Sequence, residues 1–148
     1  APWPDAAAGI CELQRLGGRG GLVAATLSNG NRSLLRDLDA HGALGFDRLL
    51  SSEDFGAYKP HPSTYLGAAG ALGLRPDQVA MVAAHLKDLV GARACGLRTI
   101  YVERLGEEEW DEHDDRYKDA REWVDIWIPL DSDGFLELAR RLGDSTAP

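Results

Sequence analysis

The sequence predicts an α/β protein, a Rossmann-like three-layer sandwich built on a parallel sheet. Apolar runs of strand length alternate with segments of helical period, which is the pattern of βαβ units. The connections are short and are marked by Gly and Pro. Polar residues follow directly after several apolar runs, where open parallel sheets bind their ligands. These three observations also predict where a functional site should lie.

Helices and strands are expected to alternate along a single domain, residues 1–148. Gly17 and Gly18 should end the first helix, and Gly73 and Gly96 should end the third and fourth, because glycine favours helix C-termini. The expected helices cover residues 5–16, 33–41, 62–72, 86–95 and 133–142, and the expected strands cover residues 22–27, 49–51, 79–83, 98–102 and 124–128.

The charge balance of the chain limits its partners. Asp and Glu number 24 against 16 Lys and Arg, so the net charge is −8 at pH 7. This excess repels phosphate backbones and anionic lipids, so neither nucleic acid nor a membrane surface is an expected partner. No apolar run approaches the roughly 20 residues that span a bilayer, and no basic segment leads into an apolar signal region. We therefore expect a cytoplasmic protein.

Two features are expected to have no chemical role. The acidic stretch at residues 106–122 is interpreted as a solvated surface excursion rather than a binding segment. Cys11 and Cys95 have no CxxC spacing and are interpreted as buried free thiols.

The first candidate site segment follows the first expected strand. Ser28 and Asn29 come at the strand end, and Gly30 leads into the next helix. Side-chain hydrogen bonders and backbone N–H groups at one strand end can bind an anion. Ser, Asn and Gly are also the usual residues of a tight turn and helix cap, so that simpler interpretation stays open.

The second segment centres on Lys59, which precedes Pro60 at the entrance to the helix that contains Tyr65. Proline restricts the residue before it to extended geometry, so Lys59 should lie in a stiff segment. A lone lysine is normally a solvated surface charge. A lysine held in this way is better suited to pairing with a buried carboxylate.

The third segment follows the apolar strand at residues 79–83. His85 and Asp88 then fall at the first turn of the next helix, where a negative side chain is stabilised by the helix dipole. Two simpler interpretations stay open: Asp88 could only cap the N-terminal turn, and His85 could be the satisfied polar end of a core strand.

Taken in chain order, the three segments resemble the second, third and fourth motifs of the haloacid dehalogenase superfamily. The finer pattern is similar to its 2-haloacid dehalogenases: Ser-Asn-Gly at 28–30, Tyr-Lys-Pro at 58–60, and Tyr65 six residues after Lys59. The opening Pro-Trp-Pro-Asp at residues 2–5 resembles the return from the cap domain of that family into its core. The resemblance extends over nearly the whole chain.

The resemblance also bears on metals. Phosphatases of this superfamily usually hold magnesium with an extra acidic residue four positions before the one matched by Asp88. This chain has Ala84 there, and alanine offers no oxygen ligand. The implied enzyme is a metal-independent hydrolase without a cofactor, and a magnesium phosphatase is disfavoured.

The resembled enzymes attack the halogen-bearing carbon with an Asp carboxylate, release halide and hydrolyse the ester. The resemblance implies that Ser28 binds the nucleophile or the substrate carboxylate and that Asn29 donates to the departing halide. Lys59 would keep the nucleophile ionised, since a nearby cation lowers a carboxyl pKa. Tyr65 would shape the site, and Asp88 would hold Lys59 and assist ester hydrolysis.

His85, also counted among the catalytic candidates, departs from the family pattern. Together with Ala83 and Ala84, it stands where characterised dehalogenases commonly place hydroxyl and amide residues. The resemblance implies a small anionic substrate, a 2-haloacid, while the exact compound stays open. Assembly as a homodimer stays open as well.

In the resembled family, the nucleophile lies on an N-terminal strand with the pattern Asp-x-x-Gly-Thr, and a helical cap follows it. The resemblance implies that this chain begins after both, so it should be inactive alone. Without that central strand, the strands at 22–27 and 79–83 should lack their shared neighbour. Asn29, Lys59 and Asp88 should converge where the carboxylate would stand.

A second candidate for the nucleophile is Asp131, which follows an apolar run. A nucleophile strand must be central, whereas Pro129 removes a ladder donor and belongs at a strand end or sheet edge. We therefore interpret Asp131 or Ser132 as the cap of the last helix.

Two other functions stay open. The chain could be a nucleophile-free module that binds anions through Ser28, Asn29 and Lys59. It could also belong to a phosphatase of the same superfamily.

Overall fold

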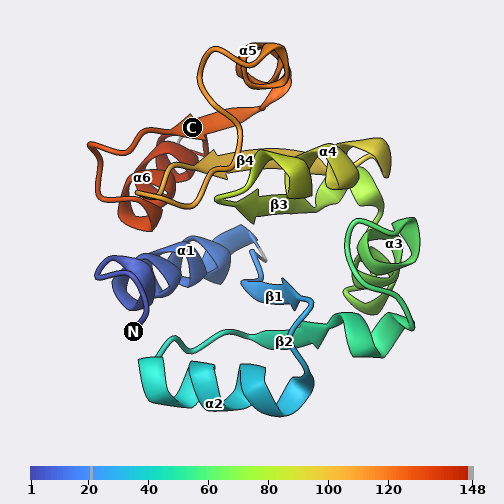
Figure 1. Ribbon diagram of the computed structural model, residues 1–148. Coiled ribbons are helices and arrows are strands. Elements are labelled where there is room, and N and C mark those ends of the chain that lie inside the picture. The colour runs from blue at the N-terminus through green and yellow to red at the C-terminus, as the bar shows by residue number, and fades with distance from the viewer. Residues whose placement is uncertain (21, 147–148) are drawn as a thin grey trace. The chain divides into compact units, whose positions relative to one another are not determined.

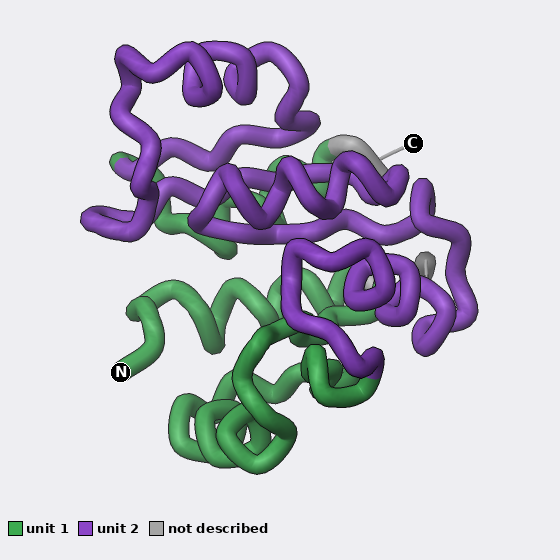
Figure 2. The backbone as a smooth tube through the Cα atoms, turned by 45° about the vertical axis from the view of Figure 1, so that its right-hand side comes forward, with its two compact units in different colours: residues 1–54, 131–148 green, residues 55–130 purple. Residues whose placement is uncertain are grey.

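The computed structural model describes residues 1–20 and 22–146, with the side chains of 17–20 and 145–146 left out. The chain forms two compact units, which Figure 2 colours separately: the first unit is Ala1–Asp54 with Asp131–Pro148, and the second unit is Phe55–Leu130. All strand pairs in the described residues are parallel. The expected α/β class with parallel pairing is therefore confirmed.

In the first unit, the helices nearest the two ends of the chain pack together (Figure 1). Helix α1 (Ala6–Gly20) lies against α6 (Phe135–Thr146). Gly9 is required for this approach, because a Cβ there would lie only 2.2 Å from Phe135 Cβ. Ile10 and Leu138 are buried in this unit.

The strands of the first unit carry the first candidate segment. Strand β1 (Ala25–Ser28) pairs with β2 (Arg48–Ser51), which places Ser28 opposite Ser51. Helix α2 (Arg32–Gly42) packs on β2, and the 3-10 turn η1 (Ser52–Phe55) follows it directly.

The second unit is built on a three-stranded sheet in the order β3-β4-β5. The central strand β4 is buried from Thr99 to Val102, and α4 packs against both β3 and β4 (Figure 1). The core joins Leu86 and Leu89 of α4 to Tyr101. The elements of this unit are α3 (Pro62–Ala71), η2 (Pro76–Gln78), β3 (Ala80–Ala83), α4 (Leu86–Ala94), β4 (Arg98–Val102), α5 (Asp115–Trp123) and β5 (Ile126–Ile128).

Strand β1 pairs with β2 in the first unit, and β3 pairs with β4 in the second unit. The expectation that β1 and β3 lack a shared neighbour stays a prediction. Pro129 follows the last residue of β5, an outer strand of its sheet, as expected for a residue that cannot donate to a ladder.

Helix α5 corrects the expectation that residues 106–122 are a solvated surface excursion. The Asp114 carboxylate caps this helix by accepting from Arg116 N at 2.8 Å. Ala120 is fully buried, and Tyr117 and Trp123 pack against the same core. Only one narrow apolar stripe carries the helical period, so the surrounding charges concealed it.

The ends of the outer helices are also corrected. Helix α1 continues through Gly17 and Gly18, because packing against α6 overrides the weak helix propensity of glycine. Gly73 and Gly96 do follow their helices, with φ of 69° and 87°. At the start of α6, the Phe135 amide donates to the Asp5 carboxylate at 2.8 Å, a partner that was not foreseen, and the preceding Gly134 amide donates to Ser132 Oγ at 3.4 Å.

Two remaining expectations concern the surface. Cys95 is a half-buried free thiol, whereas Cys11 is exposed, so the prediction that both are buried was wrong for Cys11. Among the helices that the structure describes, none combines the length and the apolar character needed to cross a membrane.

Candidate active site

An ion pair joins the second and third candidate segments. Lys59 Nζ lies 2.6 Å from Asp88 Oδ2, and the two side chains are only 15% and 16% exposed. Lys59 precedes Pro60 at the entrance to α3, and Asp88 lies in the first turn of α4, where the helix dipole stabilises a negative charge. The predicted pairing of Lys59 with a carboxylate is therefore confirmed, while its catalytic role stays a prediction.

Tyr65 binds the other carboxylate oxygen of Asp88. Its hydroxyl donates to Asp88 Oδ1 at 2.6 Å and lies 3.1 Å from the Asp88 carbonyl oxygen. Burial, and then the hydrogen bond and charge of Asp88, raise the pKa of the Tyr65 phenol well above its ordinary value. The phenol thus stays a donor, and both carboxylate oxygens of Asp88 have a fixed partner.

Gly91 allows this arrangement. It lies three residues after Asp88, on the same side of α4. A Cβ at Gly91 would lie 2.7 Å from the Tyr65 hydroxyl oxygen and 3.0 Å from Pro60 Cβ. A side chain there would push the Tyr65 ring and the Lys59-Pro60 segment away from Asp88.

His85 stands between β3 and α4, and its environment was not foreseen. Its Nε2 lies 3.1 Å from Glu107 Oε2, and both side chains are about half exposed, at 49% and 42%. The neighbouring Glu108 accepts from Leu86 N at 2.7 Å and from Trp110 N at 2.9 Å. Part of the acidic stretch therefore folds over the first turn of α4 instead of extending into solvent.

In the first unit, Ser28 and Asn29 form a tight turn. Ser28 Oγ accepts from Gly30 N at 3.0 Å. The side-chain amide oxygen of Asn29, Oδ1, accepts from the Ser52 hydroxyl at 2.7 Å, and the Ser51 hydroxyl donates to Gly30 O at 2.7 Å. Asn31, not Ser28 or Asn29, caps α2, because its side chain accepts from Leu34 N. The capping explanation for Ser28 and Asn29 is therefore replaced by a turn that Ser51 and Ser52 support.

The segment behind this turn is itself anchored. Asp54 Oδ2 accepts from Ser51 N at 2.8 Å, and its other oxygen pairs with the Arg32 guanidinium. The Ser51 amide is the main cause that lowers the pKa of the Asp54 carboxyl, with a further contribution from Arg32. The carboxylate thus holds Ser51 and Ser52 in place at neutral pH.

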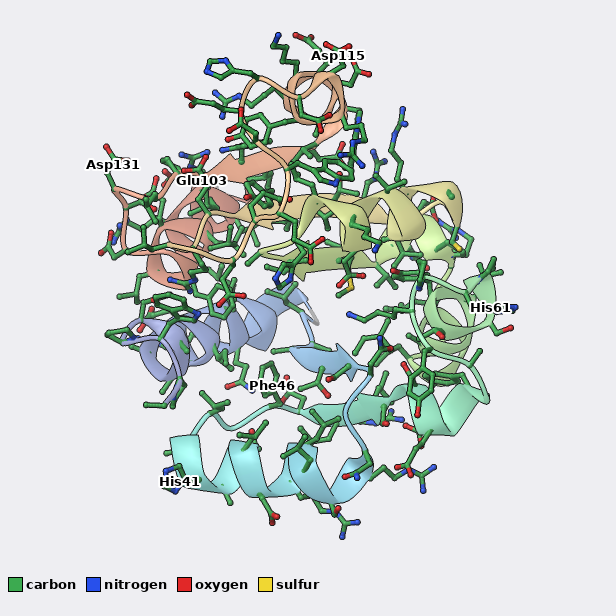
Figure 3. All side chains as sticks on the ribbon, in the orientation of Figure 1. His41, Phe46, His61, Glu103, Asp115 and Asp131 are labelled. Atoms are coloured by element: carbon green, nitrogen blue, oxygen red, sulfur yellow. The ribbon has the colours of Figure 1, made fainter. Side chains whose placement is uncertain are left out.

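The structure brings together Lys59, Tyr65 and Asp88, with His85 three residues before Asp88 on the same strand-to-helix connection. Ser28 and Asn29 lie in the first unit, so their expected convergence with Lys59 and Asp88 stays a prediction. The exposed Asp131 lies in the loop after β5 (Figure 3). Within residues 1–20 and 22–146, no group of three or more His, Cys, Asp or Glu could hold a metal ion.

Comparison with known proteins identifies the family. The sequence model of haloacid dehalogenase-like hydrolases matches residues 1–96. The chain belongs to this hydrolase family. The matched part contains all six candidate site residues, Ser28, Asn29, Lys59, Tyr65, His85 and Asp88.

Two curated members of the family show the range of activities among its relatives. The (S)-2-haloacid dehalogenase 4A of Burkholderia cepacia is 35% identical over 106 residues, which cover 70% of this chain and 44% of that protein. The phosphoserine phosphatase of Thermus thermophilus is 36% identical over 105 residues, covering 69% of this chain and 41% of that protein. This chain thus spans less than half the length of these relatives.

Solved structures of the family share its fold. The L-2-haloacid dehalogenase PA0810 superimposes with a TM-score of 0.76 at 37% identity, over 95% of this chain and 57% of that one. The L-2-haloacid dehalogenase of Xanthobacter autotrophicus gives a TM-score of 0.75 at 28% identity, over 99% of this chain and 62% of that one. The α/β core expected from the motifs is therefore the fold of this chain.

Proposed function

We propose that the protein to which this chain contributes is a 2-haloacid dehalogenase, which replaces the halogen of a small anionic 2-haloacid by hydroxyl through an aspartyl ester. The observation that carries the proposal is the poorly exposed group in which Lys59 and Tyr65 both bind Asp88. Its support from the comparisons is the set of (S)-2-haloacid dehalogenases among the most similar curated proteins.

We further propose that polypeptide outside these 148 residues supplies the nucleophilic carboxylate and the cap. Lys59 then orients that carboxylate and keeps it ionised, because a lysine ammonium has three donors and can pair with a second carboxylate besides Asp88. Asp88 holds the ammonium in place, and Tyr65 holds Asp88. In the second half-reaction, Asp88 assists the attack of water on the ester.

The first unit contributes binding groups. Ser28 binds the substrate carboxylate or the nucleophile, and Asn29 donates a hydrogen bond to the departing halide. The developing negative charge on the halide makes such a donor more effective in the transition state than in the ground state. His85 faces the substrate or the attacking water from the start of α4.

Halide release tests the proposal. The full-length gene product should release chloride from one enantiomer of 2-chloropropionate, and a metal chelator should leave the rate unchanged. The 148-residue chain alone should release none, and activity should return when the upstream segment is restored. No chloride release by the full-length product, from either enantiomer, would refute the proposal and leave a module that binds anions without chemistry.

A phosphatase is the second candidate function, because two of the similar curated proteins are phosphatases. Ala84 weighs against a magnesium-dependent one, since it offers no ligand four residues before Asp88. Magnesium-dependent phosphate release from p-nitrophenyl phosphate, without chloride release from 2-chloropropionate, would favour this alternative.

We also propose a cytoplasmic location. Its support is chemical: Cys11 and Cys95 are both free thiols, and thiols stay reduced in the cytosol.

A further inference from the structure

We infer that Ser52 is a positioning residue for Asn29, which sets the orientation of the Asn29 amide so that its nitrogen, rather than its oxygen, is presented to the leaving halide. This inference deepens the proposed function and rests on it for its catalytic part. It starts from a hydrogen bond of 2.7 Å from Ser52 Oγ to Asn29 Oδ1.

An asparagine amide has two similar ends with opposite hydrogen-bonding character. Its oxygen accepts and its nitrogen donates, so the orientation decides whether Asn29 attracts or repels an anion. In the observed orientation, the Asn29 oxygen faces Ser52, and the nitrogen is therefore turned to the other side of the side chain.

The burial of Ser52 favours this orientation over the flipped one. Ser52 is only 2% exposed, and within the described residues its hydroxyl has no acceptor other than Asn29 Oδ1. If the amide flipped, its nitrogen would face the hydroxyl, and the hydroxyl proton would lose its acceptor. A buried donor without an acceptor is unfavourable, so Ser52 selects the orientation in which Asn29 can donate elsewhere.

Ser52 is itself held by its surroundings. It begins the turn η1 directly after Ser51, whose amide and hydroxyl bond to Asp54 and to Gly30 O. The hydroxyl of Ser52 thus starts from an anchored backbone, and its bond to Asn29 reaches across 23 residues of sequence. Ser51 and Ser52 are both buried, so this segment is not an exposed loop and its position restrains Asn29.

The chain offers a matched control at Ser33. Its hydroxyl donates to Asn31 Oδ1 at 2.8 Å, so Ser33→Ala also removes a hydrogen bond from a serine hydroxyl to an asparagine amide oxygen. Asn31 caps α2 and has no role in the proposed reaction. Ser33→Ala therefore removes a serine hydrogen bond from the Asn31 amide, and Ser52→Ala removes one from the Asn29 amide.

The first experiment measures the Asn29 side-chain amide by 15N relaxation in the 148-residue chain. For comparison, a rigid backbone amide has an order parameter of about 0.85, and a flexible group falls below about 0.6. We expect a rigid Asn29 amide in the wild type and in Ser33→Ala, and a flexible or flipped one in Ser52→Ala. An Asn29 amide that stays ordered and unshifted in Ser52→Ala would overturn the inference, whatever the activity.

The second experiment measures kcat and KM of the full-length gene product with 2-chloropropionate and 2-bromopropionate. Ser52→Ala should lower kcat with the chloro substrate about tenfold, lower it less with the bromo substrate, and leave KM nearly unchanged, because chloride departs less readily and depends more on the donor. Ser52→Thr, which keeps a hydroxyl, should restore most of the rate, and Ser33→Ala should match the wild type.

Equal losses with both leaving groups, or a change in KM alone, would overturn the catalytic part of the inference. A wild type that releases neither halide would instead refute the proposed function. The relaxation measurement separates the two cases, because it reports how firmly the Asn29 amide is held, without turnover.

Discussion

The candidate site residues of the first unit and those of the second unit are held by different kinds of interaction. In the second unit, Lys59, Tyr65 and Asp88 form a charged group in which each carboxylate oxygen has a partner at 2.6 Å. In the first unit, hydroxyl and backbone groups hold the Ser28-Asn29 turn. The group in the second unit keeps an ion pair largely away from water, whereas the turn in the first unit orients neutral hydroxyl and amide groups.

This difference determines how each part should respond to mutation. Removing one member of a poorly exposed ion pair leaves the other charge without compensation, which is costly. Removing one hydroxyl from a network of neutral hydrogen bonds leaves groups that water or small rearrangements can partly satisfy. We therefore expect large effects in the second unit and smaller, more specific effects in the first.

The largest effect is expected for Lys59→Met, which keeps the length of the side chain and removes its charge. Asp88 would lose the partner of Oδ2, and we expect the free energy of unfolding to fall by about 2–3 kcal/mol. Halide release by the full-length product should fall about 100- to 1,000-fold. Urea unfolding measures the stability, and a chloride assay measures halide release.

Lys87→Met is the control, because Lys87 is exposed and lies one residue before Asp88. A loss of similar size in Lys87→Met would contradict the assigned role of Lys59.

A smaller effect is expected for Ser51→Ala in the first unit. The Ser51 hydroxyl donates to Gly30 O and accepts from Glu53 N at 3.1 Å, and the residue is fully buried. Loss of these two bonds should lower the free energy of unfolding by about 1–2 kcal/mol. Ser63→Ala, at an exposed position in α3, should change it by less than about 0.5 kcal/mol. If Ser51→Ala destabilised the chain as strongly as Lys59→Met, the contrast between the two parts would not hold.

Alkaline pH should weaken the second unit through Tyr65. Because burial raises the pKa of this phenol, the folded chain keeps the proton when the unfolded chain loses it near pH 10. The unfolded state then binds fewer protons, so Tyr65 lowers the free energy of unfolding by about 1.4 kcal/mol per pH unit above that pH. Below pH 10 this contribution to stability is fully present.

Tyr65→Phe should remove this contribution to the slope, as measured by urea unfolding between about pH 9 and 11. Tyr58→Phe is the control, because Tyr58 is 70% exposed and this variant also lacks one phenol but keeps the bond between Tyr65 and Asp88. Equal slopes in Tyr65→Phe and the wild type would show that Tyr65 does not stay protonated in the folded chain. All four tyrosines of the chain lie between residues 55 and 130, so the first unit has no phenol to titrate.

The difference between the two parts also explains what the sequence could predict. The Lys59-Asp88 pair was foreseen because a proline fixes Lys59 and a strand end delivers Asp88, and both signals are local. The five strands were found near their expected places for the same reason, since a short apolar run bounded by Gly or polar residues marks a strand without knowledge of its neighbours.

Contacts between distant loops could not be foreseen. Ser52 reaches Asn29 only because β2 pairs in register with β1, and Asp5 caps α6 across 130 residues of sequence. Helix α5 was missed because its apolar stripe is narrow within a charged segment. In each case the missing information was tertiary, and the residues themselves are ordinary serines, aspartates and glutamates.

The smallest change in the free energy of unfolding is expected for a substitution of Glu108. It tests how the acidic stretch contributes to the second unit. Its two carboxylate oxygens accept from Leu86 N, at the first turn of α4, and from Trp110 N. In Glu108→Gln one acceptor becomes a donor and the negative charge at the helix N-terminus is lost, so the free energy of unfolding should fall by about 0.5–1 kcal/mol. Amide exchange at Leu86 should accelerate with it, whereas Glu109→Gln, at an exposed neighbour, should change neither. If the two variants behaved alike, the stretch would be a solvated surface after all, and the first turn of α4 would depend on Asp88 and its ion pair alone.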